Sequence, residues 1–560
     1  MAGANFCHLP SELVEYIVSY LPQHDIYTVT RLNKALSTLA TPFLYRHVDL
    51  YIPPGDLAPR IDRFCFNILN NSRLADRVIS LRLGLHPDKA VHSGQYVLRR
   101  DSHFDDSLMF SKAMDAMSNE SLIAATDYLR DAIGTREYSA YAALILLVLP
   151  SLRHLAVADY KGATLDHLHT VLRNLDSVTT WNRRRPSQML IGRLSSIKSV
   201  SINIDSIGGM AYRRDPCRPT LDHLMNLPAV EKLEISVPEG QRGGTFLFAN
   251  PSAQLVQKPK ATNITTLVIK HSGPQISILR SLLESTPHLK SLTYDMAFSS
   301  SAEANNGPYL VDLSTWGDTL RLVMLTLETL VLSIEYCDTA LWAFKQPRIG
   351  DKFLGYLDLT YFTQLRTLQV PFPFLTGDAD FSITTEIWPL LPPTLAHLSL
   401  RTDLSHAQFS FPFDTSILPS ALPFHESKEE ASYLMNARMD VSCMFQATLT
   451  LLEQTPHLQT ISVWQPADPS LSWFDGQVTD FATTCRNKNV TGKLVYPMLL
   501  RWKKAQYWDL IREITVFDRL HPDQDRDDKF FREEWEDMPL GLSSQYHLHA
   551  LHSHQVRLYR

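Results

Sequence analysis

Four acidic residues near the end of the chain have the spacing of a calcium-binding loop. Within HPDQDRDDKFFREEW, Asp523, Asp525 and Asp527 alternate with other residues, and Glu534 stands at the twelfth position of the loop. Carboxylates with this spacing can ligate Ca²⁺. However, Asp528 occupies the sixth position, where such a loop needs glycine for its sharp turn. The density of acidic residues instead predicts a solvated, charged segment.

Two other polar runs contain residue types that could bind ligands. YHLHALHSH supplies His547, His549, His552 and His554, but a helix would bring only the first and last to one face, and no cysteine accompanies them. We therefore expect a polar tail. WNRRRPS, at residues 181–187, is compatible with a surface patch, a phosphorylation site or a localisation signal, and a solvated loop is its default interpretation.

The sequence shows no catalytic pattern. None of its six cysteines belongs to a CxxC pair, so we expect reduced thiols in a cytoplasmic or nuclear protein, not a disulfide framework or a zinc site. GxSxG, HExxH and Walker motifs do not occur. We therefore expect a protein that is not an enzyme and uses no cofactor or metal. The cysteines are Cys7, Cys65, Cys217, Cys337, Cys443 and Cys485.

Composition narrows the class of partner. The 560 residues are 44% apolar and 20% charged, with a net charge of −6, so no basic excess favours nucleic acid. The N-terminus lacks a basic stretch followed by an apolar one, and a signal peptide is not expected. The longest apolar run, AYAALILLVL, ends at Leu149 and is too short to cross a bilayer. It predicts a buried helix, and we expect no association with membranes.

One phrase occurs twice and indicates a repeated structural unit. LLESTPHLKSL begins at Leu282, and LLEQTPHLQTI begins at Leu451. The Leu-Leu-Glu part suits a helix, which Pro287 should end because proline disfavours helical geometry in the residue before it. Leu292 and Tyr294 then alternate with Thr293, as residues of a strand do. The phrase therefore predicts a helix end, a turn and a strand.

The pattern apolar-x-x-apolar-x-apolar recurs ten times. Successive copies start 25 to 74 residues apart, which leaves room for a helix between strands and implies parallel strands with right-handed crossovers. The motifs are VISLRL from Val78, LRHLAV from Leu152, IKSVSI from Ile197, VEKLEI from Val230, ITTLVI from Ile264, LKSLTY from Leu289, LETLVL from Leu327, LRTLQV from Leu365, LAHLSL from Leu395 and LQTISV from Leu458.

These motifs resemble leucine-rich repeats, in which one strand per repeat lines the inner face of a curved solenoid. The resemblance is partial. The family places Asn or Cys eight positions after the first leucine, to bond backbone groups in the turn, and here repeat lengths are irregular. We expect a horseshoe with uneven curvature and protruding loops, the alternative being an unrelated α/β domain with leucine-rich strands. Residues at the eighth position include Tyr160, Asp205, Ser272, Pro238, Pro373 and Pro466.

The first fifty residues predict three short helices. Leu13, Ile17 and Leu21 recur every four positions beside two valines, which predicts a helix with one broad apolar stripe. Pro22 should end this helix. Asp25 can cap a second helix, and a third should open at residue 33 and end before residue 42. So small a bundle cannot bury all of its apolar side chains, which implies a partner that covers the rest.

This stretch resembles the F-box. The family signature Leu-Pro-x-Glu-Leu matches Leu9, Pro10, Glu12 and Leu13, and RLNKALSTLA fits the segment of its third helix. Ile17, the Leu21–Pro22 pair and the Asp25–Ile26 pair follow at the family's spacing, and ATPFLYRHVDL looks like the junction in fungal F-box proteins. Asn33 stands where Ser or Cys is commoner, and an unrelated three-helix bundle is the alternative.

The resemblance implies a role in a cullin–RING ubiquitin ligase of the SCF type. F-boxes dock on the Skp-type adaptor, which binds the cullin, and the rest of such a protein holds a client near the ubiquitin-conjugating enzyme, supplying proximity rather than bond chemistry. A scaffold that binds the adaptor without cullin is the alternative function, and an enzyme with its site in the repeats or tail is a third. The residues expected to contact the adaptor are Leu9, Pro10, Leu13, Ile17, Leu21 and Ile26.

The predicted organisation is α/β, with an F-box at 8–50, linker helices and a first repeat with a helical insertion at 51–150, a solenoid at 151–470, and a capping helix with a charged tail at 495–560. A protein client fits the broad surface of a solenoid better than a small ligand does, by analogy of fold. The face of alternate strand residues expected to meet it includes Arg82, His154, Ser201, Lys232, Glu234, Gln369, His397, Arg401 and Trp464.

Overall fold

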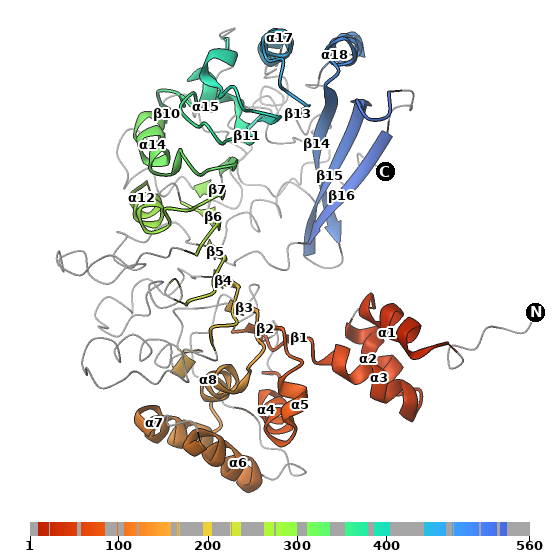
Figure 1. Cartoon of the computed structure of the whole chain (residues 1–560), viewed down its shortest axis with the longest axis vertical. Helices are drawn as coiled ribbons and strands as arrows, with labels where there is room; N and C mark the ends of the chain where they lie inside the picture. Colours follow the sequence, from red (N-terminus) through yellow and green to blue (C-terminus); the bar gives the residue numbers. More distant parts are fainter. Residues whose placement is uncertain are drawn as a thin grey trace, which may run out of the picture. The chain divides into compact units, whose positions relative to one another are not determined.

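Strands and helices alternate along most of the chain in a computed structural model (Figure 1). The chain divides into two units, which we call unit 1 (residues 1–235 and 245–259) and unit 2 (residues 236–244 and 260–560). The structure describes residues 9–21, 23–52, 58–84, 98, 106–119, 123–157, 165, 167–168, 194–203, 225, 227–236, 263–273, 276–298, 311–336, 353–378, 386–403, 442–465, 473, 475–502, 506–522 and 527–534.

Unit 1 begins with three short helices, α1 (Ser11–Ser19), α2 (Gln23–Thr30) and α3 (Lys34–Leu44), as predicted. Their buried core consists of Val14, Val18, Ile26, Leu36 and Ala40. The side chain of Asn33 caps α3 by accepting a hydrogen bond from the backbone N–H of Leu36, over 2.9 Å. The sequence therefore predicted the number of helices and the cap of the third.

Two helix boundaries differ from those predicted. α2 begins at Gln23, so Asp25 lies in its first turn and is not its cap. α3 continues through Pro42 to Leu44. The lack of an N–H at Pro42 costs the last turn of the helix one hydrogen bond, and the fixed φ of proline is compatible with a helix.

Five strands follow in unit 1, the last of which ends one residue into unit 2: β1 (His47–Asp49), β2 (Ser80–Leu83), β3 (His154–Val157), β4 (Ser199–Asn203) and β5 (Lys232–Ser236). β1 to β4 pair in parallel in that order, with Val48, Leu81, Leu155 and Val200 in register. β1 precedes the first predicted strand and was missed, because its three residues are too few to show an alternating pattern. The expected boundary of the F-box region at residue 50 therefore includes the first strand of the sheet.

Helices separate the first three of these strands. The predicted linker helix is α4 (Ile61–Asn70), followed by the short α5 (Ser72–Ala75). The predicted insertion contains three helices, α6 (Asp106–Asn119), α7 (Ile123–Gly134) and α8 (Tyr138–Val148). The apolar run forms α8, which is buried from Tyr138 to Leu147. The prediction of a buried helix is therefore confirmed.

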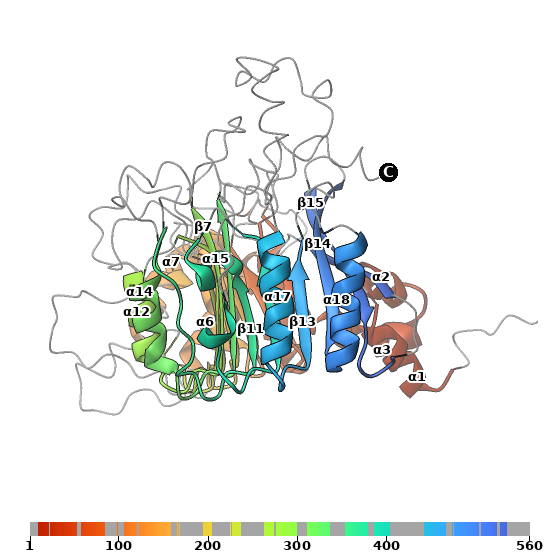
Figure 2. The ribbon, with the colours of Figure 1, turned by 90° about the horizontal axis from the view of Figure 1, so that it is seen from above.

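In unit 2, six of the predicted motifs form strands that pair in parallel in the spatial order β6-β7-β9-β11-β12-β13. All ten predicted motifs form strands, and Figure 2 shows α12, α17 and α18 along one face of the strands of unit 2. The strands are β6 (Thr266–Ser272), β7 (Ser291–Phe298), β9 (Thr329–Tyr336), β11 (Thr367–Pro371), β12 (His397–Arg401) and β13 (Thr460–Trp464).

Helices and short strands lie between and after these strands in the sequence of unit 2. Within the described ranges of unit 2, the helices are α12 (Ile276–Ser285), α14 (Leu313–Leu320), α15 (Phe372–Thr376), α17 (Ser442–Gln454) and α18 (Asp475–Lys488), with 3-10 turns η4 (Arg321–Val323) and η6 (Trp388–Leu390). β8 (Val311–Asp312) and β10 (Phe353–Leu354) form a separate two-stranded parallel sheet.

The repeated phrase forms the same structure in both places. α12 ends at Ser285 and α17 at Gln454, and each is followed by a tight turn and a strand. The core-facing residues of neighbouring strands lie in register and are almost fully buried. In unit 2 this buried row is Leu292, Leu330, Leu368, Leu398 and Ile461.

The predicted terminal helix is wrong, because the segment forms strands. β14 (Thr491–Trp502) pairs in parallel with β13, and β15 (Gln506–Phe517) returns antiparallel to β14. The segment is rich in aromatic and β-branched residues, which favour strands. Part of the predicted charged tail also forms a strand, β16 (Asp527–Glu534), paired with β15.

Candidate protein-interaction surfaces

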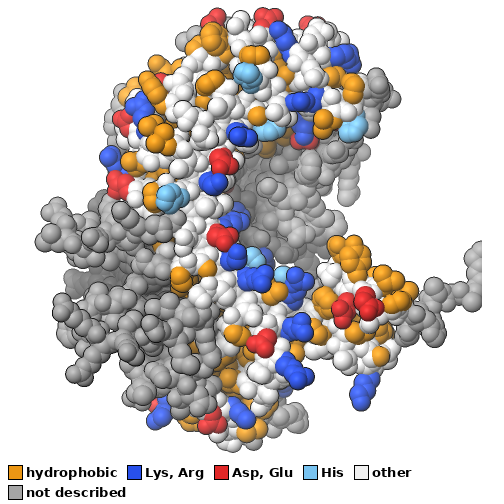
Figure 3. Space-filling model, in the orientation of Figure 1, with side chains coloured by type: hydrophobic (Ala, Val, Ile, Leu, Met, Phe, Trp, Pro, Cys, Tyr) orange, Lys and Arg blue, Asp and Glu red, His pale blue; other side chains and the backbone are white. Residues whose placement is uncertain are grey.

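The three-helix bundle exposes six large apolar side chains, which we call the bundle patch. Leu13 is 50% exposed, Tyr20 is 72% exposed and Leu32 is 63% exposed. Figure 3 shows hydrophobic side chains gathered around acidic ones on the bundle. So many large apolar groups on so small a surface indicate a site of interaction. The bundle patch consists of Leu13, Tyr16, Ile17, Tyr20, Tyr27 and Leu32.

The spacing of α1 explains why part of its apolar surface remains outside. Leu13, Ile17 and Tyr20 follow the spacing of one helix face, whereas Val14 and Val18 lie in the bundle core. The rings of Tyr16 and Tyr20 meet edge to face with centroids 5.0 Å apart, and their hydroxyls are 3.3 Å apart. This hydrogen bond raises the pKa of Tyr20.

Five of the six expected adaptor contacts fall into two groups. Pro10, Leu13 and Ile17 are exposed and available to a partner. Leu9 and Leu21 are half-buried and pack against the bundle core.

The expectation for Ile26 is revised. Its side chain is 7% exposed and belongs to the bundle core, so it stabilises the bundle and offers no surface. Tyr16 and Tyr20 were missed as surface residues. Their positions, three and seven residues after Leu13, could have placed them on the same helix face.

The residues expected to face a client are found on two separate units. In unit 1, Arg82 and Glu234 are half-exposed, and His154 and Lys232 are exposed. Ser201 is half-exposed, and its hydroxyl lies 3.2 Å from Oε1 of Glu234. All five project from strands whose alternate residues are buried.

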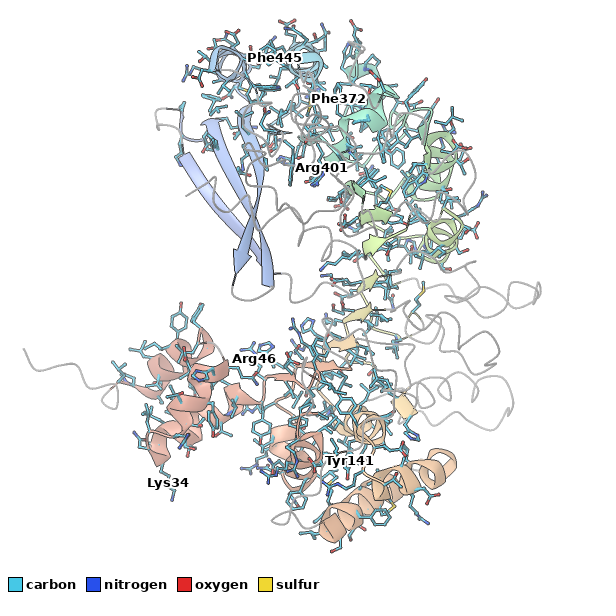
Figure 4. The ribbon with its side chains drawn as sticks, turned by 180° about the vertical axis from the view of Figure 1, so that it is seen from behind. Lys34, Arg46, Tyr141, Phe372, Arg401 and Phe445 are labelled. Atoms are coloured by element: carbon cyan, nitrogen blue, oxygen red, sulfur yellow. The ribbon has the colours of Figure 1, made fainter. Side chains whose placement is uncertain are left out.

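In unit 2, four expected residues lie on neighbouring strands. Gln369 pairs in register with Ser399, and His397 is exposed at the start of β12. Arg401 and Trp464 close the same face at the ends of β12 and β13. Figure 4 labels Arg401 among the side chains of this sheet.

Arg401 and Trp464 form an ordered pair. The guanidinium carbon of Arg401 lies 4.0 Å from the centroid of the Trp464 ring, within the range of a cation–π interaction. Nε1 of Trp464 donates to Oγ of Ser399 over 2.9 Å. Nε of Arg401 donates to Oδ2 of Asp403 over 2.7 Å. Trp and Arg held in this way are typical of the residues that dominate binding energy at protein interfaces.

Asp403 stabilises this arrangement from below the surface. Its Oδ2 also accepts the backbone N–H of Ile334 over 3.0 Å. Burial raises the pKa of the carboxyl, although Arg401 opposes this effect. Asp403 stands eight positions after Leu395, where leucine-rich repeats place a residue that bonds backbone groups. The carboxylate of Asp403 likewise bonds a backbone group of another strand, a contact that the sequence interpretation overlooked.

The strands of unit 1 carry a different surface, which we call the basic strip. The basic strip includes Arg82 of β2 and basic residues that lie at the starts of the strands or one residue before them. Figure 3 shows Lys, Arg and His side chains along these strands. Burial lowers the pKa of His154, and the neighbouring Arg153 and Lys232 lower it further. The basic strip consists of Arg46, His47, Arg82, Arg153, His154 and Lys232.

The pKa of His47 is lowered by burial and by charges of the same basic strip. Burial lowers its pKa first, followed by the charges of Arg46, His154 and Arg82. Both histidines therefore experience positive potential from several strands, which is the electrostatic signature of an anion-attracting surface.

Several sequence interpretations concern residues outside those that the structure describes. These include residues 181–187, the C-terminal histidines, and Asp523 and Asp525 of the calcium-like loop. Among the described residues, no group of three or more His, Cys, Asp or Glu side chains is arranged to hold a metal ion. Within the same ranges, no helix has the length and apolar character needed to span a membrane.

Comparisons with known proteins give no indication of function, so the functional argument rests on the surfaces described above. No protein-family model matches the sequence, and no curated protein matches it significantly.

Proposed function

We propose that this protein is the substrate-recognition subunit of an SCF-type cullin–RING ubiquitin ligase, cytoplasmic or nuclear in location. The bundle would bind the Skp-type adaptor, and the strand faces would bind a protein client. The observation that carries the proposal is the bundle patch, together with the match of Leu9, Pro10, Glu12 and Leu13 to the F-box signature.

The burial pattern of α1 supports adaptor binding by the bundle. Val14 and Val18 anchor α1 in the bundle core, whereas Leu13, Ile17 and Tyr20 face outward and could meet another protein. Burying each large aliphatic side chain contributes about 1.5–3 kcal/mol. Leu13 and Ile17 together would therefore supply a large part of the affinity of a typical complex.

The pair of Arg401 and Trp464 supports a protein client for the strand face of unit 2. The indole offers an apolar surface, and the guanidinium offers donors held in one orientation by Asp403. Groups positioned in advance lose little freedom on binding. In this role the protein performs no bond chemistry, because it raises the rate of ubiquitin transfer by holding the client close to the conjugating enzyme.

An adaptor-binding scaffold without cullin is the second candidate function. The same bundle patch supports it, because adaptor binding is common to both functions. The two differ in whether cullin accompanies the adaptor and whether any bound protein gains ubiquitin.

Changing the bundle patch tests the proposal in the full-length protein. The double variant Leu13→Asp/Ile17→Asp should reduce capture of the adaptor by at least about 100-fold, because two buried aliphatic contacts are lost. Cullin should disappear with the adaptor. The measurement is affinity capture from cells followed by quantitative mass spectrometry.

Two comparisons make the test specific. Thr38→Asp, at an exposed polar site of α3, should leave capture unchanged. Circular dichroism should show equal helix content in all variants, because Leu13 and Ile17 lie outside the bundle core. Equal adaptor capture by the double variant and the wild type would contradict the assignment of the bundle.

A further inference from the structure

The basic strip arises from the alignment of five strands. Backbone N–H groups of Ile79, Arg153 and Lys198 donate to the carbonyls of Arg46, Ile79 and Arg153, respectively. The backbone N–H of Glu231 then donates to the carbonyl of Lys198. These five residues therefore hold equivalent positions, one residue before each strand.

The next position along the strands continues the pattern. His47, Ser80, His154 and Ser199 lie side by side in register at the starts of β1 to β4. The backbone N–H of Lys232 bonds to the same carbonyl of Lys198 as does that of Glu231, which aligns Lys232 with this row. Histidine or lysine side chains therefore alternate with serine hydroxyls along the row.

Two arginines of the basic strip have no counter-ion among the described residues. Arg46 and Arg153 are exposed and make no ion pair within the part of the chain that the structure describes. Their neighbours differ in this respect, because Lys198 lies 2.9 Å from Glu231 and Lys232 lies 3.4 Å from Glu234. The two arginines can therefore bind an external anion without first breaking an internal pair.

We propose that the basic strip binds an acidic segment of a polypeptide, with Arg46 and Arg153 as its main contacts. That this polypeptide is a ubiquitination client rests on the proposed function. The five strands span four inter-strand spacings, about 19 Å in total. This is the length of about six residues of extended chain, so a short acidic stretch would cover the strip.

The charge pattern favours a polypeptide over a nucleic acid. Asp49, Glu231 and Glu234 lie on the same strands, or immediately before them, between the cations. These carboxylates would repel an uninterrupted phosphate backbone, whereas a peptide can place neutral residues opposite them. The net charge of −6 also works against the long-range attraction that nucleic-acid binding needs.

Peptide binding to the purified full-length protein tests the proposal. The probe is a fluorescein-labelled Glu-rich peptide, followed by fluorescence anisotropy, with a counterpart that has Gln in place of Glu. The wild type should bind only the acidic peptide, and added salt should weaken the binding. Arg46→Glu/Arg153→Glu should weaken it about tenfold or more. Arg73→Glu, at an exposed site of α5, is the matched control and should bind like the wild type.

Other outcomes would overturn the proposal. Failure to bind the acidic peptide at low salt, or equal binding by the double variant, would remove the strip as a docking surface. Stronger binding of a single-stranded oligonucleotide would reassign it to nucleic acid. Competition by inorganic phosphate as effective as that by unlabelled peptide would reassign it to small anions. Adaptor capture by Arg46→Glu/Arg153→Glu, measured separately, distinguishes failure of this proposal from failure of the proposed function.

Discussion

Individual residues of this protein show how a buried polar group can support an exposed one. Asp403 is too deeply buried to contact a client directly. Its carboxylate nevertheless accepts hydrogen bonds from Arg401 and from the backbone of β9. A buried donor left without its acceptor costs about 1–3 kcal/mol. The orientation of Arg401 over Trp464 therefore depends on a residue that a client would not touch.

Two replacements of Asp403 should show how much its hydrogen bond to the backbone N–H of Ile334 contributes to stability. Asp403→Ala should lower the free energy of unfolding by about 1–3 kcal/mol, because the N–H of Ile334 loses its acceptor inside the protein. Asp403→Asn keeps an amide oxygen that can accept this hydrogen bond and should be less destabilised. Urea unfolding followed by circular dichroism checks both variants. Equal stability of the alanine variant and the wild type would show that the buried hydrogen bond contributes nothing.

At the scale of elements, the strands could be predicted from the sequence and their partners at the C-terminus could not. The apolar spacing of motifs such as LKSLTY and LQTISV follows from one buried face and one exposed face, so each identified a strand. The same argument has no force for β1, which has three residues. The hairpin of β14 and β15 was misread because short apolar runs such as MLL suit both helices and strands.

The candidate surfaces were predictable to a different degree. Leu13 and Ile17 were expected at the surface from a signature, and the structure exposes them. Ile26 was expected beside them, but the packing of three helices places it in the core. The pairing of Arg401 with Trp464 depends on which strands are neighbours across a gap of 63 residues in sequence, and no local pattern contains that information.

The parallel strands make a direct prediction about stability. Leu292→Asn places an amide in the buried row of unit 2 and removes apolar contact, so it should lower the free energy of unfolding by about 3–5 kcal/mol. Thr293→Asn, one residue along, changes a half-exposed position and should cost less than about 1 kcal/mol. Thermal unfolding of the two variants side by side provides the measurement. Equal melting temperatures would contradict the alternation of buried and exposed residues in β7.

At the scale of the whole molecule, the bundle and the sheet of unit 1 are joined through β1. Gln23 of α2 bonds the backbone carbonyl of His47 over 2.9 Å, and Tyr45 stacks on Phe64 of α4. Removal of residues 1–50 would therefore also remove a strand that pairs with β2. Point changes in the bundle patch separate adaptor binding from client binding more cleanly than a deletion does.

The measurement that tests the central claim most directly combines ubiquitin-remnant and protein-turnover proteomics in cells. It compares the full-length protein with Leu13→Asp/Ile17→Asp and with Thr38→Asp as control. If the protein is a substrate receptor, its clients should be captured by both the wild type and the double variant. In cells with the double variant these clients should carry less ubiquitin and have longer half-lives, because they are held but not delivered to the conjugating enzyme. If no captured protein changes in ubiquitination or half-life, the receptor role is contradicted.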